Sequence, residues 1–240
     1  MTIPKKLHQI WIQGEENIPE KLKKYQQGWS SYRSKGWQYK VWDENAIKKI
    51  LTPKLLDMYN RSLTNAGKSD IARIAIIYSE GGFYVDFDFE SLNDITDMLY
   101  NYDFIAGYEA NYGGQINNAL FGAVPRHRIL KEVIEHWESH PYDPYQSPVD
   151  STGPVVFTKV INKYLDDPKI MIYPREILYP YGYWEPNRRG EHFPNAYAVH
   201  HWDKSWGMEF FSHTVKKYMP CIVIILLIII ILWYYRRRLF

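Results

Sequence analysis

Hydrophobic positions change their spacing repeatedly along this chain, which predicts strands alternating with helices. Short apolar runs that fit strands are followed by longer stretches in which apolar residues recur every three or four positions. Strands are predicted at 7–12, 39–42, 83–89, 104–108, 119–124 and 171–173. Helices are predicted at 20–34, 44–51, 69–79, 129–139 and 154–165. Such alternation predicts an α/β sandwich with a mostly parallel sheet, whose ligands bind beyond the carboxyl ends of the strands.

The most informative pattern begins with the helix predicted at 69–79. Ser69 is a candidate N-cap, and the glycine pair at 81–82 fits a C-terminal stop. Asp70 and Arg73 are three positions apart, so they share one face of this helix. A surface ion pair between them would contribute only a few tenths of a kcal/mol, roughly. The alternative is a pair of functional side chains.

The strand predicted next carries an Asp-x-Asp motif. Strand side chains alternate between two faces. One face would carry Tyr84, Asp86, Asp88 and Glu90, and the other Phe83, Val85, Phe87 and Phe89. The side chains of the second, apolar face are expected to be buried. Two carboxylates so close repel each other unless a cation lies between them, and a divalent cation that bridges a diphosphate suits this role.

These motifs together resemble the core of the family 32 glycosyltransferases. The motifs are Ser-Asp-x-x-Arg at 69–73, Gly-Gly-x-Tyr at 81–84 and Asp-x-Asp at 86–88. Further landmarks in matching order are the segments 3–11 and 39–43, Asn118-Ala119, Thr152-Gly153-Pro154, and His200-His201-Trp202-x-x-Ser205-Trp206. The resemblance covers residues 3–206. It implies a GT-A-like nucleotide-diphospho-sugar transferase fold, in which helices flank a mostly parallel central sheet.

The resemblance also implies roles for individual residues. The implied catalytic residues are Asp70, Arg73 and Asn118. The implied donor-binding residues are Trp11, Asp70, Arg73, Asp86, Ser205 and Trp206, with Trp11 stacking on the base. The implied ligands of a Mn²⁺ or Mg²⁺ ion are Asp86, Asp88 and His201, and the choice between His200 and His201 stays open. A core tryptophan is the alternative for Trp11.

The activity that the resemblance implies is transfer of a hexosyl unit from a nucleotide-sugar donor with retention of anomeric configuration. Mannose is the favoured sugar, and the acceptor is a glycan or a glycolipid such as inositol phosphoceramide. Front-face substitution is favoured over double displacement, because carboxylates that bridge a metal are unavailable as nucleophiles. Two alternatives are a metal-dependent phosphoesterase and a non-catalytic, membrane-anchored sugar-binding protein.

Composition agrees with one catalytic domain, predicted at 1–215. The chain has 240 residues and a net charge of +2, which supplies no argument for nucleic-acid binding. Aromatic residues make up 17% of it, more than a core needs, and flat rings suit sugar faces and nucleobases. Cys221 is the only cysteine, which excludes an intramolecular disulfide.

The C-terminal segment predicts a membrane anchor at 219–235, followed by a basic tail at 236–240. Residues 221–233 are uninterrupted apolar sequence with lysines before and three arginines after. About 15 residues of helix cover about 23 Å of a hydrocarbon core of about 30 Å, so a thin bilayer is expected. A buried strand or helix is the alternative. With no N-terminal signal sequence in view, a cytosolic catalytic domain is expected, and a Golgi or ER lumenal one stays open.

Overall fold

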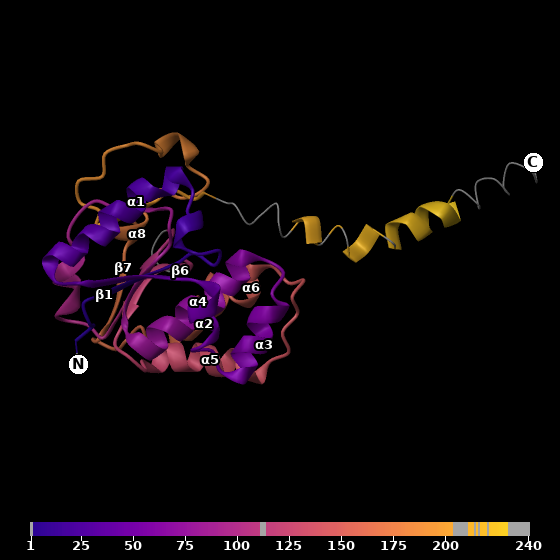
Figure 1. The fold of residues 1–240 in the computed structure, drawn as a ribbon, viewed down its shortest axis with the longest axis horizontal. Coiled ribbons are helices and arrows are strands. Elements are labelled where there is room, and N and C mark those ends of the chain that lie inside the picture. The colour runs from indigo at the N-terminus through magenta and orange to yellow at the C-terminus, as the bar shows by residue number, and fades with distance from the viewer. Residues whose placement is uncertain are drawn as a thin grey trace, which may run out of the picture. The chain divides into compact units, whose positions relative to one another are not determined.

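The computed structural model describes residues 2–110, 114–203, 211–213, 215, 217–219 and 221–229. It divides into two compact units, Met1–Asp203 and Lys204–Phe240. The first unit carries the α/β fold drawn in Figure 1. The first unit ends at Asp203, and the bounds 1–215 of the catalytic domain stay a prediction.

Eight strands and eight helices are present in the described part of the first unit. The strands are β1 (Lys6–Ile10), β2 (Gln38–Trp42), β3 (Gly82–Val85), β4 (Phe89–Ser91), β5 (Phe104–Tyr108), β6 (Ile116–Ala123), β7 (Ile170–Tyr173) and β8 (Ala198–His200). The helices are α1 (Glu20–Ser30), α2 (Glu44–Lys48), α3 (Pro53–Arg61), α4 (Asn65–Glu80), α5 (Arg128–Ser139), α6 (Pro148–Ser151), α7 (Pro154–Ile161) and α8 (Arg175–Leu178). Shorter 3-10 helices span Glu15–Asn17, Ser31–Lys35, Ile95–Leu99, Asn162–Tyr164 and Pro186–Arg188.

The central sheet has six strands in the order β2-β1-β3-β6-β5-β7. All of them run in one direction except β6, which is antiparallel to both of its neighbours. The predicted mostly parallel sheet is therefore confirmed. Because β6 is reversed, its first residues lie at the edge where β1 and β3 end. A separate antiparallel pair, β4 and β8, completes the strands.

Helices cover both faces of the sheet, as Figure 1 shows with α1 and α8 on one side and α2, α4 and α5 on the other. Because side chains alternate between the two faces of a strand, a hydrophobic core forms on each side of the sheet. Phe83 and Val85 of β3 pack with Trp29 of α1 and Leu178 of α8. Tyr84, between them, packs with the apolar face of α4 on the opposite side. The hydrophobic effect thus fixes β3 in the middle layer, which positions the residues that follow it.

The strand predicted at 83–89 is interrupted, which corrects the predicted shared face of four polar residues. β3 ends at Val85, and the Phe89 amide donates to the carbonyl of Asp86 at 3.2 Å, closing a turn over 86–88. The chain then leaves the central sheet, and β4 pairs with β8. The four interleaved apolar residues are nevertheless buried as predicted, namely Phe83, Val85, Phe87 and Phe89.

The helix predicted at 69–79 begins earlier. Thr64 caps α4 by accepting a hydrogen bond from the Gly67 amide at 3.1 Å, so Ser69 lies inside the helix instead of capping it. The stop is confirmed, because Gly81 and Gly82 have φ of 64° and 95°, values that favour glycine. The predicted helix at 20–34 is split into α1 and a 3-10 turn, and α3 was not predicted.

Substitution of Gly122 on β6 tests how tightly the central layer is packed. A Cβ atom added there would lie 2.7 Å from the Phe83 ring, so Gly122→Ala should lower the free energy of unfolding by about 1–3 kcal/mol. Gly28 of α1 is a matched control, because an added Cβ would meet Ser91 at an ordinary 3.6 Å. Gly28→Ala should be neutral or stabilising by about 0.5–1 kcal/mol. Urea unfolding in which both variants matched the wild type would contradict this packing.

His8 of β1 is buried and uses both ring nitrogens. Its Nε2 lies 3.0 Å from the Gly81 carbonyl, and its Nδ1 accepts from Trp42 Nε1 at 3.0 Å. These partners require the neutral tautomer protonated on Nε2, since a second proton on Nδ1 would face the indole N–H. Burial lowers the pKa of His8 to about 4, with smaller opposing effects from Gly81 and Glu80.

The lowered pKa of His8 predicts a pH dependence of stability. Between pH 6.5 and 4 the unfolded chain binds more protons at this residue than the folded chain does, so stability falls as the pH falls. Between pH 7 and pH 5 the wild type should lose about 2 kcal/mol more than His8→Gln. Urea unfolding at both pH values measures the difference. Substituting the exposed His192 by glutamine should keep the wild-type slope, and an unchanged slope in His8→Gln would refute the assignment.

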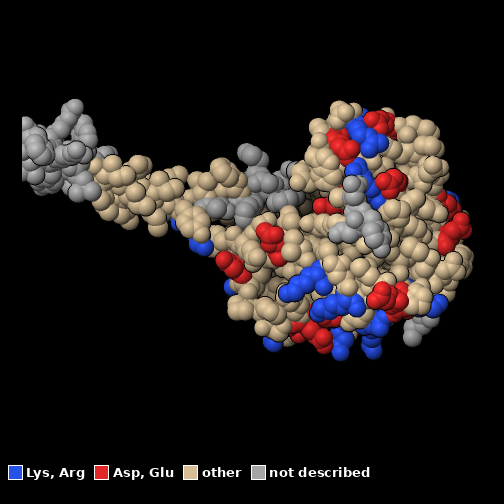
Figure 2. All heavy atoms as spheres, turned by 180° about the vertical axis from the view of Figure 1, so that it is seen from behind, with Lys and Arg blue, Asp and Glu red and all other residues tan. Residues whose placement is uncertain are grey.

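Charged side chains of both signs are mixed over the face of the molecule shown in Figure 2. Among the described residues visible on that face, neither sign covers a wide area alone. This distribution agrees with a sequence whose net charge is only +2.

The second unit is helical in its described residues, at 211–219 and 221–229 with gaps. In this part of the chain, no single helix has the length and hydropathy needed to cross a membrane. The segments Phe211–Met219 and Cys221–Ile229 reach that length together, bent by 46° at the break between them. Residues 230–235 of the predicted anchor and the tail at 236–240 lie outside the described residues.

Candidate active site

Several of the predicted site residues lie at the edge of the sheet where β1 and β3 end and β6 begins. Trp11 directly follows β1, Asp86 directly follows β3, and Asn118 lies near the start of β6. The Asp86 amide donates to the Ala119 carbonyl at 2.8 Å, which joins the end of β3 to the start of β6. The reversed direction of β6 therefore brings Asn118 to the Asp-x-Asp motif.

Arg73 of α4 is the centre of the site. Its side chain is buried, and its Nη2 atom lies 3.1 Å from Asp86 Oδ1 and 3.4 Å from Asp70 Oδ1. Its Nη1 donates to the Asn118 carbonyl at 3.0 Å, and its Nη2 donates to Ser69 Oγ at 3.1 Å. One buried guanidinium thus holds two carboxylates from different elements. The predicted pair on one helix face is part of this larger network.

Asp70 is held by two further side chains. Asn118 Nδ2 donates to its Oδ1 at 3.0 Å, and Thr152 Oγ1 donates to its Oδ2 at 3.2 Å. Gly153 allows this approach, because a Cβ there would lie 3.2 Å from the same carboxylate oxygen. Burial raises the pKa of Asp70 to about 6, although the charge of Arg73 lowers it.

Asp86 follows β3 and accepts a short hydrogen bond from the Tyr84 hydroxyl. That hydroxyl also lies 3.2 Å from Ser69 Oγ, which links it to α4. Burial raises the pKa of Asp86, the Arg73 charge opposes this, and the nearby Asp88 carboxylate raises it again. A cation added beside the two aspartates would relieve this repulsion.

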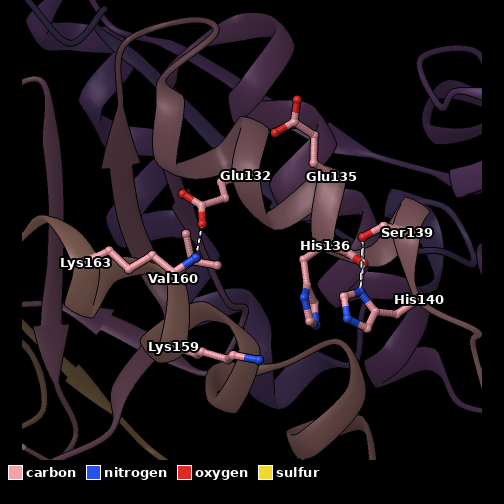
Figure 3. A pocket seen from close by; sticks show the side chains of 8 residues that line it. All are labelled: Glu132, Glu135, His136, Ser139, His140, Lys159, Val160 and Lys163. Atoms are coloured by element: carbon pink, nitrogen blue, oxygen red, sulfur yellow. Dashed lines mark hydrogen bonds and ion pairs between the residues drawn. The ribbon is translucent and has the colours of Figure 1, made fainter.

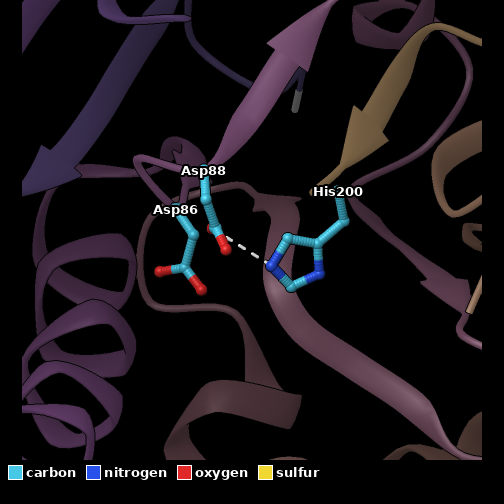
Figure 4. A group of neighbouring side chains, drawn as sticks. All are labelled: Asp86, Asp88 and His200. Carbon is cyan, nitrogen blue, oxygen red and sulfur yellow. Dashed lines mark hydrogen bonds and ion pairs between the residues drawn. The ribbon is translucent and has the colours of Figure 1, made fainter. Parts of the chain in front are cut away.

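Asp88 and His200 are brought together by the pairing of β4 with β8, in which Phe89 is opposite His200. His200 Nε2 lies 3.1 Å from Asp88 Oδ1, and the Asp203 amide donates to Asp88 Oδ2 at 2.9 Å. Burial alone would raise the pKa of Asp88, but the charge and hydrogen bond of His200 outweigh it and lower the pKa. Figure 4 shows both carboxylates and the imidazole turned toward one space.

These three side chains suit a divalent cation. One ligand atom from each of Asp86, Asp88 and His200 lies within 4.8 Å of the others. The buried Nδ1 of His200 has no hydrogen-bond partner among the described residues, so the ring is not tied on both sides. Two carboxylates and an imidazole match the preferences of Mn²⁺, and the carboxylates also suit Mg²⁺.

His201, which the resemblance implied as a metal ligand with His200 as the open alternative, points away from the aspartates. Its Nε2 lies 2.9 Å from Glu90 Oε2, its Nδ1 lies 3.2 Å from the Tyr181 hydroxyl, and its ring stacks on Tyr25 at 4.6 Å. Neighbouring residues at the end of a strand face opposite ways. Because His200 faces the aspartates, His201 faces Glu90. The resemblance pointed to this pair of histidines and left the choice between them open. The geometry favours His200 over His201 as the metal ligand.

Trp11, Ser205 and Trp206 are the remaining predicted site residues, and of these three only Trp11 is described. Trp11 packs edge-to-face on Phe87 with ring centroids 5.3 Å apart, and its buried Nε1 has no partner among the described residues. Ser205 and Trp206 lie outside the described residues, so their assignment stays a prediction. Tyr84 and Thr152 were not assigned a role from the sequence, although both belong to the family landmarks and hold the aspartates.

A separate cavity of about 230 Å³ lies between α5 and α7, away from this edge of the sheet. Figure 3 shows its lining, in which His136 and His140 are neighbours and Lys163 pairs with Glu132. None of the residues predicted to bind donor or metal lines it. It is therefore not part of the candidate active site.

Comparison with known proteins identifies the family. The model of the glycosyltransferase sugar-binding region containing a DXD motif matches residues 19–105, and this range includes Asp86 and Asp88. The chain belongs to this family of DXD glycosyltransferases. It is 30% identical over 167 residues to an uncharacterized glycosyltransferase of Acanthamoeba polyphaga mimivirus, covering 68% of this chain and 66% of that protein.

Relatives in the DXD glycosyltransferase family include inositol phosphoceramide mannosyltransferase 1 of Schizosaccharomyces pombe. That protein is 27% identical over 221 residues, covering 85% of this chain and 62% of its own length. Human alpha-1,4-N-acetylglucosaminyltransferase is 28% identical over 184 residues, covering 65% of this chain and 50% of that protein. The chain thus spans less than two thirds of the length of these relatives.

Solved structures of glycosyltransferases share the fold. The PaToxG glycosyltransferase superimposes with a TM-score of 0.53 at 18% identity, covering 68% of this chain and 70% of that one. The UDP-bound glycosyltransferase domain of the YGT toxin gives 0.51 at 11% identity, covering 71% and 79%. These likenesses confirm that this member of the DXD family has a glycosyltransferase fold.

Proposed function

We propose that this chain is a metal-dependent, retaining glycosyltransferase that moves a hexosyl unit from a nucleotide-diphosphate sugar to a glycan or glycolipid acceptor. The observation that carries the proposal is the convergence of Asp86, Asp88 and His200 within 4.8 Å, next to the buried Arg73 network. This cluster lies at the strand edge where open α/β sheets bind their ligands.

Each part of the site has a separate task. Asp86, Asp88 and His200 would hold Mn²⁺ or Mg²⁺, which neutralises the charge of a departing diphosphate. Arg73, Asp70 and Asn118 form a rigid polar wall for the hydroxyls of the donor sugar. Trp11, at the end of β1, offers its indole to the nucleobase. Because the wall is already hydrogen-bonded internally, it needs little reorganisation when the donor binds.

The buried state of the carboxylates supports front-face substitution. Asp70 is only 6% exposed and is already bound by Arg73, Asn118 and Thr152. A nucleophilic carboxylate in double displacement must instead reach the anomeric carbon freely. With Asp86 and Asp88 committed to the cation, the departing diphosphate is the base that remains for the acceptor hydroxyl.

The relatives suggest which sugar and acceptor to test first. Inositol phosphoceramide mannosyltransferase 1 of S. pombe matches over 85% of this chain, which favours mannose as the sugar and inositol phosphoceramide as the acceptor. A lipid acceptor would also suit an anchor at 219–235. In the described part of that segment, residues 221–229 are apolar, helical and exposed. We propose that this segment holds the catalytic unit at a membrane, with its active site in the cytosol; a lumenal site in the Golgi or ER is the alternative.

Products of donor cleavage test this function and separate it from a phosphoesterase. The full chain is incubated with UDP- and GDP-sugars one at a time, first with Mn²⁺ and then with EDTA, and the products are separated by chromatography. A glycosyltransferase should release a nucleoside diphosphate from one donor, only with the metal. Release of a nucleoside monophosphate and a sugar phosphate would indicate a phosphoesterase. Binding of a donor without any cleavage, with and without acceptor, would favour a sugar-binding protein.

A further inference from the structure

Two adjacent aromatic residues, Tyr183 and Trp184, stand half exposed on the segment between α8 and β8. Their exposed fractions are 50% and 47%. Elsewhere in the described part of the first unit, large exposed apolar residues occur singly, namely Leu92, Tyr100, Val155 and Leu165. Single exposed apolar residues are common on protein surfaces and need no explanation. Two adjacent exposed rings form a continuous apolar patch, which more often marks a binding site.

The turn that carries this pair is held firmly. Glu185 accepts a hydrogen bond from the Gly182 amide at 2.9 Å and forms a short ion pair with Arg175 of α8. Arg188 Nη1 donates to the Pro180 carbonyl at 2.9 Å from the other side of the turn. Hydrogen bonds and an ion pair therefore hold the turn that carries the two rings. Their exposure is a property of this ordered turn.

A row of rings joins this pair to the candidate metal site. The Tyr183 ring lies 5.9 Å from Trp202, and the Trp202 ring lies 4.1 Å from His200, measured between centroids. Trp202 is fixed by a hydrogen bond from its Nε1 to the Tyr181 carbonyl at 2.9 Å. A single ring, that of Trp202, therefore lies between Tyr183 and the proposed ligand His200.

We propose that Tyr183 and Trp184 form a stacking platform for the ring of the acceptor, a sugar or a cyclitol. This inference rests on the proposed function. The acceptor hydroxyl must reach the anomeric carbon of a donor whose diphosphate lies at Asp86, Asp88 and His200, so the acceptor ring must bind beside that cluster. A polyol ring has one face of C–H groups, which packs on a flat aromatic ring while its hydroxyls stay in water.

The rim of the platform favours a polyol over bilayer hydrocarbon. The Arg175 guanidinium lies 5.8 Å from the centroid of the Trp184 ring, and Arg175 pairs with Glu185, which directly follows Trp184. Arg188 and Arg189, further along the same segment, bind Glu191 and Asp203 at 2.9 Å and 3.0 Å. Ionic side chains of both signs around two rings are suited to hydroxyl groups. An apolar chain would instead require a wider uncharged surface.

The platform is tested first by binding, which does not depend on turnover. Saturation-transfer NMR is recorded on the full chain with methyl α-mannoside and with myo-inositol as probes, in the presence of UDP or GDP and the diamagnetic ion Mg²⁺. The wild type should transfer magnetisation to the C–H protons of at least one probe. The double substitution Tyr183→Ala with Trp184→Ala should abolish that transfer. Tyr100→Ala, a substitution at a single exposed aromatic residue, is the matched control and should preserve it.

Kinetics then separates this proposal from the function on which it rests. In the double variant, the ratio of transfer to donor hydrolysis should fall at least tenfold, with inositol phosphoceramide in detergent micelles as acceptor. Trp184→Phe, which keeps a flat ring, should retain most of the wild-type ratio. The platform is overturned if the wild type binds neither probe, or if binding and ratio in the double variant match those of Tyr100→Ala. Absence of nucleotide release by the wild type, with probe binding intact, would instead contradict the proposed function.

Discussion

Replacing Asp88 by asparagine should reduce metal-dependent release of nucleoside diphosphate by about a hundredfold or more, with the fold retained. Asparagine keeps the size of the side chain and an oxygen that can accept the 2.9 Å hydrogen bond from the Asp203 amide. It loses the negative charge that a cation requires. Initial rates at saturating Mn²⁺ measure the effect, and circular dichroism checks the fold. Turnover equal to that of the wild type would refute the role of Asp88 in binding the metal.

The two histidines provide a matched pair for the same experiment. His200→Gln should weaken Mn²⁺ binding by about tenfold or more, since one ligand is lost. His201→Gln should weaken it much less, because His201 Nε2 lies on Glu90 and faces away from the aspartates. If His201→Gln were the more damaging substitution, the assignment of His200 would be incorrect.

Replacing Arg73 by methionine should lower the free energy of unfolding by about 3–5 kcal/mol and abolish turnover. The guanidinium is the buried cation that both Asp70 and Asp86 contact, at 3.4 Å and 3.1 Å. Methionine fills a similar volume but leaves two buried carboxylates without their counter-charge. Urea unfolding at pH 7 measures the loss.

A surface arginine is the control for this prediction. Arg61 pairs with Asp57 four residues earlier on α3, and both side chains are largely exposed. Arg61→Met should therefore change stability by less than about 0.5 kcal/mol. Equal stability of the Arg73→Met variant and the wild type would mean that the buried network does not stabilise the fold.

Much of this architecture could be predicted from local patterns. Apolar spacing indicated the strands that contain Leu7, Tyr39 and Phe104, and the glycines at 81–82 marked the end of α4. Strand ends at one edge of a parallel sheet come together, so the convergence of Trp11 with the aspartates followed from the predicted topology.

The rest depended on contacts between distant segments. Whether the chain continues straight after Val85 or turns is decided by the pairing of β4 with β8, more than 100 residues later, and local alternation cannot show this. The same pairing decides that His200, and not His201, faces Asp88. The reversed direction of β6, which brings Asn118 to Asp70, is likewise set by its neighbours in the sheet.

Calorimetric titration of UDP and of GDP into the full chain, with Mn²⁺ and then with EDTA, tests the central claim most directly. We predict that one of the two nucleotides binds with Mn²⁺, and that binding is lost in EDTA and in Asp88→Asn. That result would establish a metal-dependent diphosphate site at Asp86, Asp88 and His200. Binding of equal strength in EDTA, or binding unaffected by Asp88→Asn, would contradict it.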